Sequence, residues 1–485
     1  MSPSRLPHIL FRSAIPDRSI EIEYAIRFLL EPYSVRLTFL QPGQRAQDEG
    51  VRVLYAPVDY ESNDRPDIHI AASDFWEAFR ISDSPVPRWE GIPIPAGCVT
   101  PGGGWMETRS KCVCLFADVI ASTFFFLARV EELNRPVVDK HGRFPASASF
   151  ATREKVLDQP IVEVMGERFV KVLEQIAGPI DRRNPWSPFQ AACAITHDVD
   201  SLQKYGSLPG ELYRFQKGVF RGHFRAAGRR LFDFFTADRD PFDCLDRMAE
   251  TQKRKNIHAT FFFLVSDKTK HDAPKPFDSD FVGTRIRSLL ERFEVEIGLH
   301  PSYLSSEQSE LVALEKQRLE IIAGTVCQGS RQHYLRLTYP ETLRHLEAAG
   351  LAYDCSLGFA DAEGFRAGTC RPFRPFDPIQ RRVMNLWELP LTCMDNTLFT
   401  YQQCSADSAA ERIAHLAETV RRYQGILVLL FHNRIYDSPD YTPVGEAFNQ
   451  TLQHIEESGV WLCDTCSNLL KTYQTISDSA HGPSV

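Results

Sequence analysis

The alternation of short apolar runs with helical segments after residue 190 is the feature that most constrains how this chain can fold. Strands are predicted at 191–196, 258–264, 294–299 and 426–431, and helices at 241–254, 305–322, 340–349 and 409–423. This order predicts an α/β fold with a parallel sheet or barrel covered by helices. In either architecture functional side chains gather at the carboxyl ends of the strands.

The residues before this alternation predict a second, smaller unit. A chain of 485 residues is long enough for two domains. Residues 1–145 predict a mixed α/β domain with strands at 34–40, 51–56 and 67–71 and helices at 20–30 and 116–133. In the last helix Phe124, Phe125, Leu127 and Val130 are expected to be buried. Residues 146–189 read as a connector with a polar, proline-broken end, and 190–475 as the second domain.

Charge and hydropathy exclude some classes of function. The formal net charge of −8 argues against a nucleic-acid-binding protein, which usually carries a basic excess. No apolar run is long enough for a signal peptide or a transmembrane helix, so we expect a cytoplasmic protein. Cys463 and Cys466 have the spacing of one half of a zinc finger, but no second pair accompanies them, which disfavours a structural zinc site.

One segment departs from this acidic background. Residues 212–230 contain six arginine or lysine residues and no acidic residue. A solvated helix face explains this pattern, and so does a patch for an anionic substrate or for peripheral contact with an anionic membrane surface.

Polar side chains follow three of the predicted strands directly. Asp198 and Asp200 follow 191–196, His300 follows 294–299 and His432 follows 426–431. Two carboxylates two residues apart repel each other, and a bound cation would stabilise them. Each of these residues taken alone more often has a structural role. Together, carboxylates and histidines at one edge of a sheet predict a metal-dependent site.

The motifs at these positions resemble those of the polysaccharide deacetylases, the carbohydrate esterases that act on chitin, peptidoglycan and exopolysaccharides. The similar stretches are 196–200 (THDVD), 259–264 (ATFFFL), 296–300 (EIGLH), Arg331, 353–357 (YDCSL) and 430–432 (LFH). The resemblance covers about residues 190–470. Stretches 125–133, 139–144 and 160–162 also resemble the region that precedes this domain in one subgroup.

The resemblance implies a distorted (β/α) barrel with a divalent metal at its mouth, with zinc expected and cobalt, nickel, manganese or iron as alternatives. It implies that Asp198 is the general base, that Asp200 and His300 bind the metal, that Arg331 orients the base and that His432 is the general acid. The family's second metal-binding histidine would stand at position 304, which is leucine here. His333 is the candidate replacement.

The chemistry of these residues is coherent with amide hydrolysis. An Asp-His-His set leaves coordination positions for water and a substrate carbonyl. A general base and a general acid then serve the attacking water and the departing amine. We expect removal of an acyl group from an amino sugar in an oligosaccharide or polysaccharide, and the action of another metal-dependent amidohydrolase is the alternative within this chemistry. Without an export signal, a nucleotide-linked or lipid-linked precursor is a suitable substrate.

Four further residues are candidates for substrate binding. Tyr303 and Trp387 could stack on a sugar ring, and Asp395 could line the cavity. Arg366, between two glycines, could reach a substrate oxygen or pair with a carboxylate. Structural roles are the alternative for all four.

Two other functions use the same residues. Two histidines and one carboxylate also describe the non-haem iron oxygenases, in which the acid–base pair Asp198 and His432 would be idle. A catalytically silent carbohydrate-binding protein on the same fold is the second alternative, because fold does not determine function.

Overall fold

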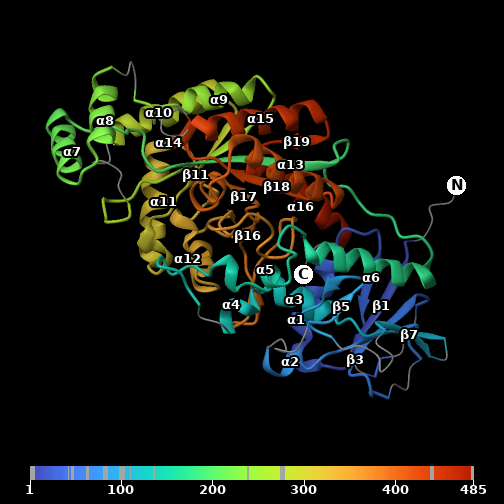
Figure 1. The fold of residues 1–485 in the computed structure, drawn as a ribbon. Coiled ribbons are helices and arrows are strands. Elements are labelled where there is room, and N and C mark those ends of the chain that lie inside the picture. Colours follow the sequence, from blue (N-terminus) through green and yellow to red (C-terminus); the bar gives the residue numbers. More distant parts are fainter. Residues whose placement is uncertain are drawn as a thin grey trace.

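The computed structural model describes residues 6–481, apart from 42, 45–47, 62–64, 80–85, 98–103, 110, 135–136, 237–239, 273–278 and 437–441. Two separate β-sheets organise the fold (Figure 1). The first is built from the amino-terminal residues and the second from the residues after 190, with α6 (Ile161–Ala177) between them in the chain.

The first sheet has six strands in the order β2-β1-β3-β4-β8-β7, and only β7 runs antiparallel to its neighbour. The strands are β1 (His8–Ser13), β2 (Arg36–Phe39), β3 (Val51–Ala56), β4 (Ile68–Ala71), β7 (Met106–Arg109) and β8 (Cys112–Leu115). The three predicted strands are confirmed as β2, β3 and β4, and the predicted helix 20–30 as α1 (Ser19–Leu30). β1 was not among the predicted strands, although its residues Ile9, Leu10 and Phe11 are buried.

The second sheet is entirely parallel, with the order β16-β13-β12-β11-β10-β9-β18-β17, and β19 pairs with the start of β9. The strands are β9 (Ala191–Val199), β10 (Ala259–Phe263), β11 (Val295–Leu299), β12 (Gly329–Ser330), β13 (Tyr353–Asp354), β16 (Trp387–Glu388), β17 (Cys393–Met394), β18 (Ile426–Leu430) and β19 (Trp461–Cys463). Within the described residues, β16 and β17 do not pair with each other. The expected barrel is therefore an open, curled half-barrel.

Helices cover this sheet as the alternation predicts. The predicted helices are confirmed as α9 (Leu245–Lys253), α11 (Ser309–Ala323), α12 (Glu341–Ala348) and α13 (Ala406–Arg422). α13 packs against β9 and β18, and α11 packs with α10 (Ser279–Arg292) against β11. β9 has strands on both sides, and all of its residues are buried. Its last residues therefore emerge in the middle of the carboxyl edge.

The predicted helix 116–133 is wrong in one respect, because it is two helices, α3 (Val119–Leu127) and α4 (Val130–Asn134). Arg129 interrupts it with a φ of 47°, in the left-handed region. This turn lets the buried guanidinium of Arg129 pair with Glu131 at 2.9 Å and with Glu132 at 2.7 Å. The predicted burial of Phe124, Phe125, Leu127 and Val130 is confirmed.

The two sheets share one hydrophobic core. A single cluster of buried side chains includes Phe11 of β1, Phe124 of α3, Phe169 of α6 and Phe261 of β10. Buried ion pairs also link the two halves of the chain: Arg371 pairs with Glu163 at 2.9 Å and with Glu31 at 2.8 Å.

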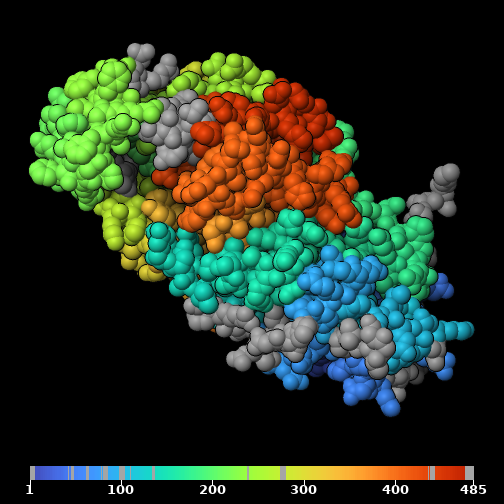
Figure 2. All heavy atoms as spheres, viewed as in Figure 1, coloured from blue at the N-terminus to red at the C-terminus, as the bar shows by residue number. Residues whose placement is uncertain are grey.

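The basic segment 212–230 lies in an insertion between β9 and α9. It forms two helices, α7 (Leu208–Phe220) and α8 (Phe224–Thr236), which pack against each other. The pair projects at one end of the molecule (Figures 1 and 2). None of the helices in the described part of the chain has the length and hydropathy needed to cross a membrane.

Candidate active site

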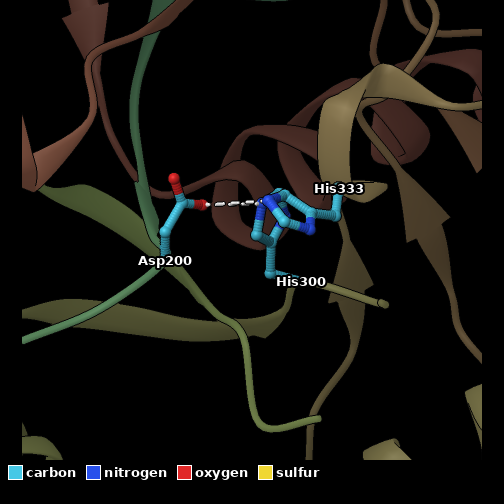
Figure 3. Close-up of side chains that lie close together, drawn as sticks. All are labelled: Asp200, His300 and His333. Atoms are coloured by element: carbon cyan, nitrogen blue, oxygen red, sulfur yellow. Dashed lines mark ion pairs between the residues drawn. The ribbon is translucent and has the colours of Figure 1, made fainter. Parts of the chain in front are cut away.

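Asp200, His300 and His333 converge at the carboxyl edge of the second sheet (Figure 3). They follow β9, β11 and β12 respectively. Oδ1 of Asp200 lies 3.3 Å from Nε2 of His300 and 3.6 Å from Nε2 of His333. One candidate ligand atom from each residue lies within 4.8 Å of the other two. Ligands bound tetrahedrally at about 2.1 Å are separated by roughly 3.4 Å, so the spacing suits a divalent metal ion.

Hydrogen bonds at the opposite ring nitrogens aim both histidines at this point. Nδ1 of His300 donates to the main-chain carbonyl of Arg331. Nδ1 of His333 donates to Oδ1 of Asp272 at 2.7 Å. Because these oxygens only accept, Nδ1 carries the proton in each ring and Nε2 keeps its lone pair for a metal.

Two of the atoms that face the candidate metal position have no hydrogen-bond partner in the described part of the chain. Oδ1 of Asp200 and Nε2 of His300 are buried, and neither makes a hydrogen bond among the described residues. Burial raises the pKa of Asp200, but the charges of Arg434 and the neighbouring histidines more than offset this and hold that pKa well below its ordinary value. The residues therefore present an ionised carboxylate and two imidazoles, a set that fits a divalent cation.

The loop after β12 explains how the third side chain reaches the site. Leu304, at the position of the family's second histidine, is 39% exposed. His333 is held instead by its main-chain N–H, which donates to the carbonyl of Pro301 at 3.0 Å. Tyr334 and Leu335 then have positive φ values of 62° and 52°, which turn the chain sharply after His333.

Asp198 lies beside this cluster with Arg331. Its side chain is buried at the end of β9, and Oδ1 lies 3.7 Å from Nη1 of Arg331. Oδ2 of Asp198 lies 3.7 Å from Nε2 of His300. Arg331 is itself fully buried and donates to Oγ1 of Thr196 at 3.2 Å. Asp198 Oδ1 makes no hydrogen bond among the described residues, so this carboxylate oxygen can accept one from a water molecule.

His432 follows β18 and is bound by Asp395 at two points. Nδ1 of His432 lies 2.8 Å from Oδ1 of Asp395, and its main-chain N–H donates to Oδ2 at 2.6 Å. Burial lowers the pKa of His432, but the carboxylate of Asp395 more than offsets this, so the pKa is raised above its ordinary value. The structure thus gives Asp395, a candidate for substrate binding, a positioning role toward His432.

Two residues near the site were not among the predicted ones. Asp272, in the loop after β10, is fully buried and binds His333. Arg434, two residues after His432, lies with Nη1 3.1 Å from Oδ2 of Asp200. Arg434 comes soon after β18, at the same edge, and its place in the sequence could have indicated it. Asp272 stands farther from the end of β10, behind other polar residues, and no signal in the sequence singles it out.

Two of the other three candidates, Tyr303 and Arg366, contact side chains of the same chain. His271 stacks on the ring of Tyr303, with centroids 4.1 Å apart, and the guanidinium of Arg336 lies 4.5 Å from its centroid. Arg366 takes the second of its two predicted roles, because it pairs with Glu132 at 2.7 Å and both side chains are buried.

Trp387 lines a cavity of about 420 Å³ together with residues of α1 and the segment 372–374. None of Asp198, Asp200, His300 or His333 lines this cavity. The structure thus does not bring Trp387 together with the Asp-His-His cluster.

The two parts of the chain are similar to different known proteins. Residues 12–178 match a family of unknown function, DUF7033. A search of curated proteins gave no match.

Several solved structures resemble the larger part of the chain. Puue allantoinase is 15% identical with a TM-score of 0.42, and the match covers 61% of this chain and 95% of that one. The peptidoglycan deacetylase PdaC from Bacillus subtilis is 12% identical with a TM-score of 0.31, and the match covers 60% and 96% of the two chains. A CE4-family pseudoenzyme from Bacillus anthracis is 10% identical with a TM-score of 0.31, and the match covers 57% and 65%. With TM-scores below 0.5, these likenesses do not establish a function for the chain.

Proposed function

We propose that this protein is a metal-dependent deacetylase that hydrolyses the acyl amide of an N-acylated amino sugar. The observation that carries the proposal is the convergence of Asp200, His300 and His333, with ligand atoms within 4.8 Å of one another, beside the pairs Asp198–Arg331 and His432–Asp395. The cluster would hold a divalent ion, with zinc as our first expectation. Such an ion polarises a carbonyl and makes a water molecule more acidic.

Asp198 acts as the general base in this proposal. Its buried carboxylate accepts the proton of the attacking water, and Arg331, with Nη1 3.7 Å from Oδ1, orients it. Asp198 is better suited to this role than Asp200, because Asp200 is the carboxylate that lies closest to both histidines.

His432 acts as the general acid. An amine anion is not a viable leaving group near neutral pH, so the departing nitrogen must be protonated. Asp395 accepts from Nδ1 of His432, which leaves Nε2–H as the proton that His432 delivers. The raised pKa of His432 favours the protonated form that this step requires.

The substrate class rests on the resemblance of the sequence motifs to the polysaccharide deacetylases. An amino sugar in an oligosaccharide, or in a nucleotide-linked or lipid-linked precursor, is the substrate we propose. Tyr334, which is 37% exposed and packs on His333 with centroids 4.6 Å apart, is a more accessible aromatic side chain for a sugar than Tyr303.

Elemental analysis of the purified protein tests the metal site. We expect about one equivalent of a divalent metal in the wild type, and its loss in Asp200→Ala, His300→Ala and His333→Ala. Leu304→Ala is the matched control and should retain the metal. If His333→Ala were the one variant of the three to retain the metal, the third coordination position would belong to another ligand.

Acetate release from N-acetylglucosamine oligomers then tests the reaction. A metal-loaded wild type that releases acetate, with zinc and without oxygen, supports the deacetylase. Activity that requires oxygen and iron would support an oxygenase instead. A protein that binds the oligomers but takes up no metal would be a carbohydrate-binding protein.

A further inference from the structure

The helical pair α7–α8 exposes large apolar side chains that the fold leaves uncovered. Phe220 is 92% exposed, Phe224 62%, Phe232 66% and Phe235 64%. Tyr213, Leu212 and Leu208 are exposed on the same pair. Isolated exposed apolar residues are common, but four exposed phenylalanines on two adjacent helices form a patch of a kind that marks an interaction surface.

Helical geometry gathers these side chains. At 3.6 residues per turn, Phe224, Phe232 and Phe235 fall within roughly 80° of one face of α8. Phe220 ends α7 and Phe224 begins α8, so these two flank the turn that joins the helices. On the inner side, the residues Gly218 and Ala227 approach closely, which packs the helices against each other.

The charge around the apolar face is strongly basic. Residues 208–236 contain six arginine or lysine residues and two acidic ones, Glu211 and Asp233. Glu211 is buried and bound by Arg214 and Arg230. In the part of the chain that the structure describes, Lys217, Arg221 and Arg225 form no ion pair. On α8, Arg225 follows Phe224 and is rotated from it by about 100° around the helix axis, which places it beside the apolar face.

The side chains of Asn433 and Asp240 hold the base of this helical pair. The amide nitrogen of Asn433 donates to the carbonyls of Ser201 at 3.0 Å and Phe242 at 2.8 Å, one on each side of the insertion. Asp240 accepts from the main-chain N–H groups of Lys204 at 2.7 Å and Tyr205 at 2.9 Å. Because Asn433 follows His432 directly, the base of the pair is anchored next to the candidate site.

We propose that α7 and α8 form a peripheral docking element for an anionic lipid bilayer. Exposed phenylalanines beside exposed arginines match an interfacial helix, whose apolar side chains enter the acyl boundary while its cations contact anionic headgroups. The charge selects this occupant over a second copy of the chain, because two such basic surfaces repel each other. Docking would bring a lipid surface to the edge of the sheet at which Asp198 and Asp200 lie.

Vesicle co-sedimentation of the full-length protein tests the proposal. We expect binding to vesicles that contain phosphatidylglycerol, weak binding to pure phosphatidylcholine, and a loss of binding as salt is raised. Phe220→Ser with Phe224→Ser should weaken partitioning at least roughly tenfold, and so should Arg221→Gln with Arg225→Gln. All four side chains are exposed, so the thermal midpoint should not change.

Matched substitutions elsewhere separate this effect from general changes of the surface. Ile321→Ser, at a side chain that is 75% exposed on α11, and Arg422→Gln on α13 should leave vesicle binding unchanged. The absence of wild-type binding to anionic vesicles would overturn the proposal, and so would equal binding to neutral vesicles. A concentration-dependent dimer that the phenylalanine substitutions abolish would also overturn it, because the patch would then be an interface between copies of the chain.

Discussion

Asp272 and His333 are joined by a 2.7 Å hydrogen bond that determines which ring nitrogen of His333 faces Asp200. Asp272 is fully buried, and it accepts from Oγ1 of Thr269 at 2.7 Å and from the main-chain N–H of Tyr303 at 2.9 Å. These bonds fix the carboxylate, which in turn fixes the imidazole. In the proposed metal site, a histidine from the loop after β12 can therefore take the place of one four residues after His300.

Removal of this support should weaken metal binding without removing a ligand. We expect Asp272→Asn to lower metal affinity about tenfold and Asp272→Ala up to about a hundredfold, because the partner of a metal-binding histidine fixes its orientation and raises its basicity. Competition with a chromophoric chelator measures the affinity. The control is Asp267→Asn, at a carboxylate that is 86% exposed, which should change nothing. An unchanged affinity in Asp272→Ala would show that His333 needs no such support.

Asp198 and Asp200 are two residues apart, but their substitution should have different effects on activity and metal content. Asp198→Asn should lower kcat by about 10²-fold to 10⁴-fold while the metal content remains near that of the wild type, because general bases contribute by this amount. Asp200→Asn should reduce metal content itself. Parallel measurement of acetate release and metal content distinguishes the two. Loss of metal in Asp198→Asn would make Asp198 a ligand rather than the base.

Asp395 should set the alkaline limit of activity through His432. The carboxylate raises the pKa of His432, and the proposed reaction needs the protonated imidazole, so activity falls as the pH rises through that pKa. Asp395→Asn removes the charge, lowers the pKa of His432 and should move the alkaline limb of kcat/KM to lower pH. If the alkaline limb of the pH profile stayed at the same pH, a group other than His432 would be responsible for it.

The chemistry of the strand ends could be predicted from the sequence, whereas the loops around them could not. Asp198, Asp200, His300 and His432 each follow an apolar run directly, and parallel strands bring such positions to one edge. Asp272 is 61 residues from its partner His333, and Asp395 is 37 residues from His432. Both pairings depend on how loops fold over the edge, which no local pattern determines. Packing between distant parts of the chain likewise decides that Arg366 pairs with Glu132 and that Trp387 faces α1.

The ion pair of Glu132 with Arg366 and Arg129 should be essential for stability. The three side chains are almost completely buried, and Glu132 contacts both guanidinium groups at 2.7 Å. Glu132→Gln leaves two buried cations without this carboxylate, and we expect a loss of about 3–5 kcal/mol in the free energy of unfolding. Glu418→Gln, which breaks an exposed pair with Arg421, should cost less than about 1 kcal/mol. Urea denaturation measures both, and equal losses would contradict the expectation.

Glu211 should make the stability of the helical pair α7–α8 depend on pH. Burial raises the pKa of this carboxyl, but Arg230, Arg214 and the main-chain N–H of Gly206 outweigh that effect and lower the pKa from 4.5 to about 2. A lowered pKa stabilises the fold above pH 4.5, and this stabilisation is lost as the pH falls from 4.5 toward 2. Glu211→Gln should therefore reduce hydrogen-exchange protection of α7 and α8 at pH 7, and the difference from the wild type should shrink below pH 4.5. Asp233→Asn, at a carboxylate whose oxygen lies 4.0 Å from Arg229, is the control and should have a much smaller effect. A difference between Glu211→Gln and the wild type that stays constant from pH 7 to pH 3 would contradict this origin of the stabilisation.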